Sequence, residues 1–232
     1  MAIDDLRNRD WVLLPGTLCT GDVFRGFLDA LGIAAARRKP VSLCHPEIAA
    51  YQTALTSQSE GSIICGFSLG AIVAAHHADR LSAHRIILFG VNPFPDDPAK
   101  EAGRHDLARD VMAMGGASAL GARLPPLLGA TPDQARADLL AMADATAPEI
   151  EAQTHLALTR PGAIAALSRA VPPVLILTGA EDRMTPAAQG QAAAEAAPCG
   201  RFRLLPQLGH YALMEDPAAC AQAVVAMEDT FR

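Results

Sequence analysis

Residues 62–73 read SIICGFSLGAIV, and this stretch decides the fold. Its centre is a G-x-S-x-G pattern, with Ser68 between Gly66 and Gly70. An apolar run typical of a buried parallel strand precedes the pattern, and a helical pattern follows it. A serine on such a sharp strand-to-helix turn projects its hydroxyl from the edge of a sheet, in a strained backbone conformation. The two glycines let strand and helix pass closely, because a Cβ atom there would clash. We therefore predict that Ser68 is a nucleophile.

A tight glycine turn with an incidental serine is the alternative interpretation of this stretch. It explains the glycines but not the strand before them and the helix after them. A second stretch of similar composition, residues 115–121 (GGASALG), has different spacing and no preceding strand. We predict that residues 115–121 form a loop.

Short apolar runs alternate with helical patterns along much of the chain. The candidate strands are residues 11–14, 41–43, 62–65, 85–89, 174–178 and 201–205. The candidate helices between them are residues 23–31, 69–80, 187–197 and 217–231. This alternation predicts an α/β fold with a mostly parallel sheet of about six strands, flanked by helices.

One segment interrupts the alternation. Residues 92–173 contain no convincing strand, and their helical patterns cover residues 101–114, 132–145 and 148–159. An all-helical insertion of this length exceeds what a strand-to-helix connection needs. We predict a helical lid inserted before the penultimate strand, over the carboxyl edge of the sheet. The domain division is then a core of residues 1–91 and 174–232 with a lid of residues 92–173.

A serine hydroxyl is a poor nucleophile until an imidazole takes its proton, and a carboxylate must fix the tautomer of that imidazole. Glu181 and Asp182 both lie just past the strand at residues 174–178, so they share the sheet edge with Ser68. Asp182 is preferred because the carboxylate that orients the histidine is usually on the shorter side chain, and Glu181 stays an alternative. His210 follows the last strand at that same edge, whereas the other six histidines fit surface or packing positions. The order serine, aspartate, histidine completes the predicted triad of Ser68, Asp182 and His210.

Composition excludes several classes of function. The chain has 232 residues, a formal net charge of −6 and no run of Lys or Arg, which argues against a nucleic-acid partner. Its five scattered cysteines fit neither a zinc site nor a disulfide framework, and we expect buried free thiols. The N-terminal residues lack the apolar core of a signal peptide, and no stretch reaches the ~20 apolar residues of a membrane span. We expect a cytoplasmic, bacterial protein without metal or organic cofactor and without a membrane partner.

Three motifs together resemble a known family. The G-F-S-L-G turn, the G-A-E-D-R-M-T-P stretch around Asp182 and the G-H-Y-A-L-M-E-D-P stretch around His210 are similar to small bacterial serine esterases of the α/β-hydrolase fold. These include the branch related to pimeloyl-acyl-carrier-protein methyl ester esterase. The resemblance implies an oxyanion hole made by the backbone N–H groups of Thr17 and Leu69.

The resemblance is imperfect in two loops. Pro15 stands where the family usually carries a histidine, which removes a side chain and a backbone donor. The bracing of that loop must therefore differ, and Leu18 is a candidate substitute donor. The Asp-x-x-Gly-x-Gly turn of the family is also missing, and residues 44–46 read CHP in its place.

The sequence thus predicts hydrolysis of a small to medium carboxylic ester, thioester or lactone through an acyl-serine intermediate. Carbon–carbon bond hydrolysis and acyl transfer use the same triad and stay open, whereas Ser68 excludes the aspartate-nucleophile chemistry of haloalkane dehalogenases and epoxide hydrolases. A non-catalytic small-molecule receptor is the main alternative of another class, since a docking protein has no positive support. A carrier-protein-bound substrate is not favoured, because residues 92–173 mix Lys100 and six arginines with ten acids.

Overall fold

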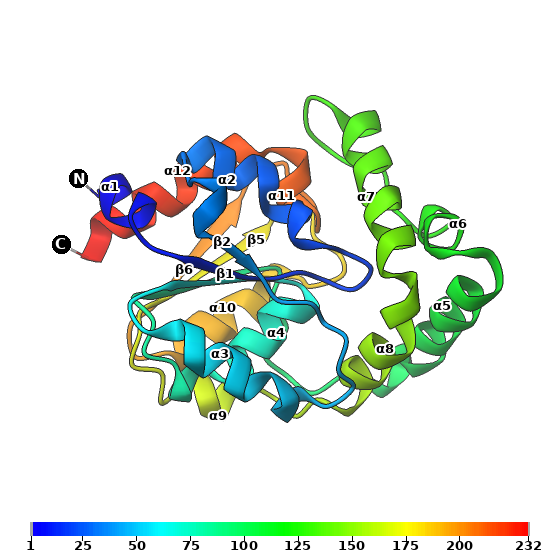
Figure 1. Ribbon diagram of the computed structural model, residues 1–232, viewed down its shortest axis with the longest axis horizontal. Helices are drawn as coiled ribbons and strands as arrows, with labels where there is room; N and C mark the ends of the chain where they lie inside the picture. Colours follow the sequence, from blue (N-terminus) through cyan, green and yellow to red (C-terminus); the bar gives the residue numbers. More distant parts are fainter. Residues whose placement is uncertain (1, 232) are drawn as a thin grey trace.

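The computed structural model describes residues 2–231, and its centre is a six-stranded parallel sheet (Figure 1). The strand order is β2-β1-β3-β4-β5-β6. The strands are β1 (Trp11–Leu14), β2 (Arg38–Pro40), β3 (Ile63–Phe67), β4 (Arg85–Phe89), β5 (Val174–Gly179) and β6 (Gly200–Leu205). All neighbouring pairs are parallel, which confirms the predicted architecture.

The chain changes direction across the sheet between β1 and β3. From β1 it first adds β2 on one side, and it then returns to place β3 on the other side. In such open sheets, ligands bind in the crevice outside the carboxyl ends of the strands at the point of reversal. The register pairs Leu14, the last residue of β1, with Gly66 in β3. The segments that follow β1 and β3 therefore meet at this crevice.

Helices cover both faces of the sheet because its strands alternate their apolar side chains. Trp11 and Leu13 pack into the cluster on one face, and Val12 and Leu14 into the cluster on the other. The first face carries α1 (Ala2–Arg7), α2 (Arg25–Leu31), α11 (Ala212–Glu215) and α12 (Pro217–Glu228). The second carries α3 (Gln52–Ser59), α4 (Leu69–His76), α9 (Ile164–Leu167) and α10 (Ala187–Ala196) (Figure 1).

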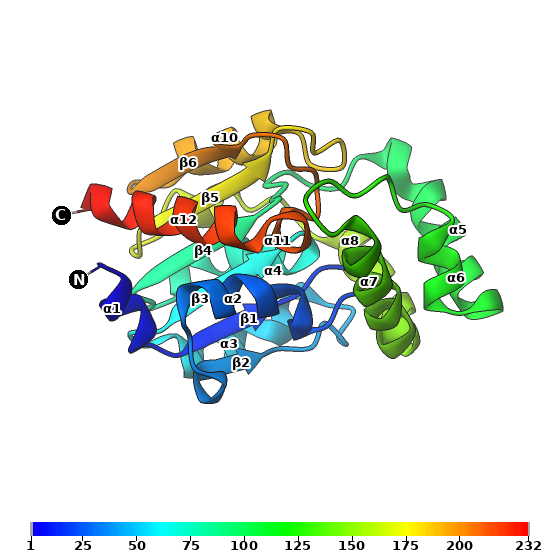
Figure 2. The same cartoon turned by 90° about the horizontal axis from the view of Figure 1, so that it is seen from above.

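A helical insertion separates β4 from β5. Its helices are α5 (Glu101–Met114), α6 (Gly116–Gly121), α7 (Pro132–Thr146) and α8 (Ile150–Thr159), and α9 follows them under the sheet. Figure 2 shows α5 to α8 beyond the carboxyl ends of the strands, at the end of the molecule away from α1 and α12. The insertion has its own apolar cluster, which includes Val111, Leu120 and Ile150. Leu18, from the loop after β1, belongs to that cluster and ties the insertion to the sheet.

Four sequence predictions need correction, and the first concerns the second strand. It spans Arg38–Pro40 rather than residues 41–43, which form a loop. β2 pairs only with β1 and lies at the sheet edge, where charged residues and proline are tolerated because one side of the backbone faces solvent. Leu43 is buried from the loop. The apolar residues 41–43 were therefore wrongly predicted to be the strand, which lies just before them.

The second correction concerns residues 115–121, which contain the short helix α6 rather than a loop. Asp144, from α7, accepts a hydrogen bond from the Ala117 N–H at 2.7 Å and so satisfies the start of the helix. A Cβ atom on Gly116 would lie 2.0 Å from the Ala143 carbonyl oxygen, so glycine lets α6 pack directly on α7. Both stabilising contacts come from a distant part of the chain.

The third correction is α3, which the sequence did not predict. Its residues read QTALTSQS, and only Leu55 and Ser59 are buried, so it presents no regular apolar face.

The fourth correction concerns the cysteines, which we expected to be buried. All five are free, and Cys19, Cys65 and Cys220 are buried, but Cys44 and Cys199 are exposed. Within residues 2–231, no helix is both long and apolar enough to cross a membrane.

Candidate active site

Ser68 occupies the turn between β3 and α4 in a left-handed backbone conformation. Its φ is 51° and its ψ is −116°, a backbone conformation that a residue other than glycine adopts only under strain. Its N–H donates to the Phe89 carbonyl oxygen at 2.9 Å, and its own carbonyl accepts from Ile72 in the first turn of α4 at 3.1 Å. The turn is thus fixed from both sides, with the Ser68 hydroxyl next to the positive end of the helix.

The glycines beside Ser68 are required by space. A Cβ atom on Gly66 would lie 2.6 Å from the Ala71 Cα atom, and one on Gly70 would lie 2.1 Å from the Leu14 carbonyl oxygen. Any other residue at either position would push α4 away from the sheet. This is the close passage that the sequence pattern predicts.

The structure brings Ser68, His210 and Asp182 into one hydrogen-bonded row. His210 Nε2 lies 3.1 Å from Ser68 Oγ, and His210 Nδ1 lies 2.8 Å from Asp182 Oδ2. The His210 and Asp182 side chains are buried, with 3% and 1% exposed. An ionised carboxylate can only accept, so the proton of the neutral imidazole sits on Nδ1 and leaves Nε2 free to accept from the serine hydroxyl.

Asp182 is held in its ionised form by its neighbours. Burial alone would raise the pKa of its carboxyl, but hydrogen bonds from His210 and Thr185 bring that pKa below its usual range. The Met184 and Thr185 N–H groups also donate to Oδ1, at 2.9 and 2.8 Å. The neighbouring Glu181 is exposed instead. The geometry therefore selects Asp182 over Glu181 as the partner of His210.

Two supporting residues were present in the sequence motifs without an assigned role. The Thr185 hydroxyl donates to Asp182 Oδ2 at 2.6 Å. Glu215 accepts from the Gly209 N–H at 2.5 Å and so fixes the loop just before His210. Burial raises the pKa of the Glu215 carboxyl. Both residues lie a few positions from a predicted triad member, but their direction depends on loop geometry that the sequence does not show.

The two N–H groups expected in the oxyanion hole lie on the same cavity. Thr17 and Leu69 line it beside Ser68, and neither N–H has a hydrogen-bond acceptor among residues 2–231. Leu69 is the first residue of α4, where a backbone donor has no partner within the helix. The arrangement leaves both donors available to a ligand oxygen.

Leu18 cannot act as the substitute donor that the sequence left open. Its N–H donates to the side-chain oxygen of Gln153, in α8, at 3.0 Å. Gln153 is 1% exposed, and its amide nitrogen donates to Glu149 at 3.3 Å. Leu18 itself has a φ of 55°. The loop after β1, which carries Pro15 instead of a histidine, is thus braced from the insertion.

Four of the other histidines have partners outside this row. His77 bonds the Ile48 carbonyl oxygen at 2.9 Å, and His84 pairs with Asp5 at 3.0 Å. His105 and His155 lie near surface glutamates. In the part of the chain that the structure describes, no group of three or more His, Cys, Asp or Glu residues is placed to hold a metal ion.

Ser68 and His210 open into a cavity of about 470 Å³. The core contributes the turn at Ser68 and the loops after β1, β5 and β6. The insertion contributes residues from the helical turn Pro98–Lys100, from α5 and α6, and from the end of α8. A volume of this order suits a small organic molecule. The lining residues are Thr17, Leu18, Phe67, Ser68, Leu69, Ile72, Asn92, Ala99, Lys100, Gly103, Arg104, Leu107, Leu120, Arg160, Arg183, Met184, Thr185, His210 and Tyr211.

Known structures share this architecture at low sequence identity. A thermophilic esterase from Thermogutta terrifontis is 21% identical, with a TM-score of 0.77 over 96% of this chain and 90% of that one. The enol-lactonase from Burkholderia xenovorans is 19% identical, with a TM-score of 0.75 over 94% and 91% of the two chains. MenH from S. aureus is 17% identical, with a TM-score of 0.76 over 96% and 94%. At such identities the likeness establishes the fold alone.

No curated protein matches the sequence. The profile of the alpha/beta hydrolase family, in contrast, matches residues 6–223, which is nearly the whole chain. That match spans the strands, the turn at Ser68, the helical insertion and the loops that carry Asp182 and His210. The chain belongs to the alpha/beta hydrolase family.

Proposed function

We propose that this protein is a serine hydrolase that cleaves a carboxylic ester, thioester or lactone. The observation that carries the proposal is the buried row from Asp182 through His210 to Ser68, with distances of 2.8 and 3.1 Å. A receptor needs none of these three groups in register. A hydrolase needs all three within hydrogen-bond reach.

The geometry supports an acyl-enzyme mechanism. Nε2 of His210 takes the proton of Ser68 as Oγ attacks the carbonyl carbon, and the resulting oxyanion lies against the N–H groups of Thr17 and Leu69. His210 then gives this proton to the leaving oxygen or sulfur, and the acyl group stays on Ser68. A water molecule next loses a proton to His210 and attacks the acyl carbon, which frees the acid and returns the proton to Ser68. Asp182 stays ionised throughout.

The insertion is proposed to act as a lid that limits substrate size. Leu107, from α5, and Leu120, from α6, line the cavity together with Ser68. A bounded cavity favours soluble esters of short to medium acyl chains over emulsified long-chain lipids. The resemblance to the pimeloyl-acyl-carrier-protein methyl ester esterase branch would place a medium acyl chain here.

A substrate panel tests the proposal. The purified protein would be assayed on esters, thioesters and lactones of graded chain length, beside its Ser68→Ala variant. We expect turnover of short and medium substrates by the wild type only. Activity that increases with chain length and jumps at a lipid interface would contradict the proposed size limit. A protein that binds these compounds without turning over any of them would be a receptor, and the proposal would be wrong.

A further inference from the structure

The cavity beside Ser68 carries a concentration of positive charge. Four basic residues line it, namely Lys100, Arg104, Arg160 and Arg183, and no aspartate or glutamate is among its lining residues. The whole chain, in contrast, has a formal net charge of −6. The charged side chains that line the cavity are therefore positive, whereas the net charge of the whole protein is negative.

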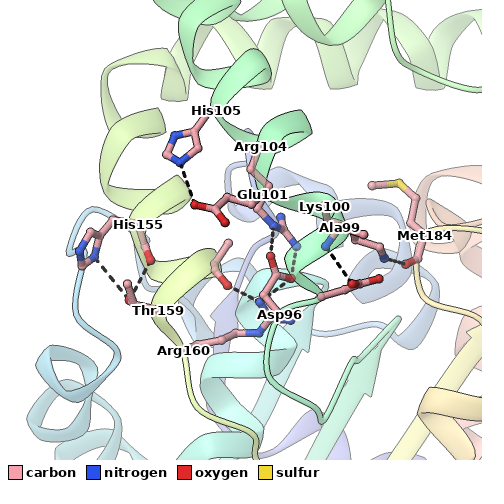
Figure 3. Close-up of polar contacts among 12 residues, drawn as sticks. Asp96, Ala99, Lys100, Glu101, Arg104, His105, His155, Thr159, Arg160 and Met184 are labelled. Carbon is pink, nitrogen blue, oxygen red and sulfur yellow. Dashed lines mark hydrogen bonds and ion pairs between the residues drawn. The ribbon is translucent and has the colours of Figure 1, made fainter.

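Asp96, which is not among the lining residues, forms ion pairs with two of these basic residues (Figure 3). Arg104 donates to it through Nε at 2.5 Å and through Nη2 at 2.6 Å, and Arg160 donates through Nη1 at 3.0 Å. Burial would raise the pKa of Asp96, but the two guanidinium groups hold it below its usual range. One ionised carboxylate balances only one of two guanidinium groups. The trio thus keeps one net positive charge.

The basic side chains also retain unused donors. Arg160 is 1% exposed at its side chain, and its Nε has no hydrogen-bond partner among residues 2–231. Lys100 is exposed, its ammonium group donates to the Met184 carbonyl oxygen at 3.3 Å (Figure 3), and within the same residues this group has no carboxylate partner. Arg183 is exposed and makes no ion pair there. Arg160 is the buried charge among these side chains, and it shares the Asp96 carboxylate with Arg104, so an anionic ligand would supply the second negative charge.

We propose that the substrate carries an anionic oxygen group, a carboxylate or a phosphate, away from its ester carbonyl. This inference rests on the proposed function, because it places the ester at Ser68. Arg104, Arg160 and Lys100 would bind the anion by charge-assisted hydrogen bonds, for which the planar guanidinium fork is well suited. Leu107 and Leu120 would contact the apolar chain between the anion and the ester. The substrate class is then half-esters of dicarboxylic acids or their phosphate counterparts.

Calorimetric titration of the Ser68→Ala variant tests this subsite without turnover. The ligands are monomethyl adipate, the neutral methyl hexanoate of equal chain length, and methyl 4-(phosphonooxy)butanoate. We expect at least one anionic ester to bind about tenfold or more tightly than methyl hexanoate, as several charged hydrogen bonds would produce. The tighter anionic ligand then identifies the group as carboxylate or phosphate. Equal or weaker binding of both anionic esters would overturn the proposal.

Variants locate the effect on the protein. In the Ser68→Ala background, Lys100→Gln and Arg104→Gln should each lower the preference for the anion several-fold. Arg109→Gln, also on α5 but paired with Asp106 at the surface, should leave it unchanged. Arg160→Gln is a weaker test because its side chain is buried and the variant can unfold, so thermal unfolding accompanies every titration. A preference that survives both Lys100→Gln and Arg104→Gln would overturn the assignment of these residues.

The two proposals fail in different ways. If the wild-type protein turns over no ester but the anion preference holds, the proposed function is wrong and the subsite stands. If the protein hydrolyses neutral esters and the titrations show no preference, the proposed function stands and the subsite is wrong.

Discussion

The core wall and the insertion wall of the cavity are built in different ways. On the core wall, Ser68, Asp182 and His210 each follow the carboxyl end of a parallel strand, so the sheet itself brings them together. On the insertion wall, Arg104 and Arg160 come from α5 and the end of α8, two helices that pack on each other, and both side chains donate to Asp96. The core wall thus depends on the strand ends of the sheet, whereas the insertion wall depends on helix packing and on side-chain pairing. We expect changes to the first to abolish the reaction and changes to the second to alter its selectivity or rate.

The largest effect is expected on the core wall. Ser68→Ala and His210→Ala should each lower turnover of an activated ester such as p-nitrophenyl butyrate by roughly 10³-fold or more, because each removes a reacting group. Circular dichroism and thermal unfolding should show an intact fold in both variants. Near wild-type kcat in either variant would mean that the reaction does not use this row.

The next effect separates two neighbouring carboxylates. Asp182→Asn should lower kcat by about 10³- to 10⁴-fold, because the amide cannot hold His210 in the required tautomer. Glu181→Gln, its matched control, should retain most activity, since Glu181 is exposed and the carboxylate that bonds His210 Nδ1 is that of Asp182. Steady-state kinetics of both variants decides the matter. A reversed ranking would mean that the acid loop has been misassigned by one position.

A smaller effect links the two walls. Gln153→Leu removes the acceptor that holds the Leu18 N–H and should loosen the loop that carries the Thr17 N–H. We expect kcat to fall about tenfold or more with little change in KM, because oxyanion contacts form only in the transition state. Gln134→Leu, on the exposed face of α7, is the control. A change confined to KM would instead assign Gln153 to substrate binding.

The smallest effect concerns stability at acid pH. The carboxyls of Asp182 and Asp96 both have pKa values below their usual range, so each stabilises the fold above the unfolded pKa of about 4 and loses that contribution as pH falls through its folded pKa. Melting temperature should therefore drop as pH is lowered from about 5 to about 3. Asp96→Asn should flatten this drop and lower the melting temperature at neutral pH. An unchanged profile would mean that Asp96 contributes no net stabilisation.

The contrast between the walls also explains what the sequence could predict. The strands at Trp11–Leu14 and Arg85–Phe89 match the predicted bounds because parallel strands buried on both faces are continuously apolar. The proximity of Ser68, Asp182 and His210 followed from the same reasoning, since strand ends share an edge. The edge strand β2 and the helix α6 were missed because one lies in a polar setting and the other is stabilised by Asp144 from a distant helix.

The insertion wall could not be read from composition. Residues 92–173 contain more acids than bases, so their charge count predicts no basic site. The structure nevertheless directs Lys100, Arg104 and Arg160 to the cavity, while Asp106 and Asp133 lie outside its lining. Gln153 was missed for the same reason, because its role depends on a contact across 135 positions of the chain. Side-chain direction on a helix follows from packing that one sequence does not reveal.

The central claim is that the buried row makes Ser68 a nucleophile, and labelling with a fluorophosphonate probe tests it most directly. Such a probe reacts only with an activated serine. Mass spectrometry of the wild-type protein should find the label on Ser68, and labelling should be lost in His210→Ala but retained in Glu181→Gln. An unlabelled wild-type protein, a label on another residue, or equal labelling of His210→Ala would contradict the account.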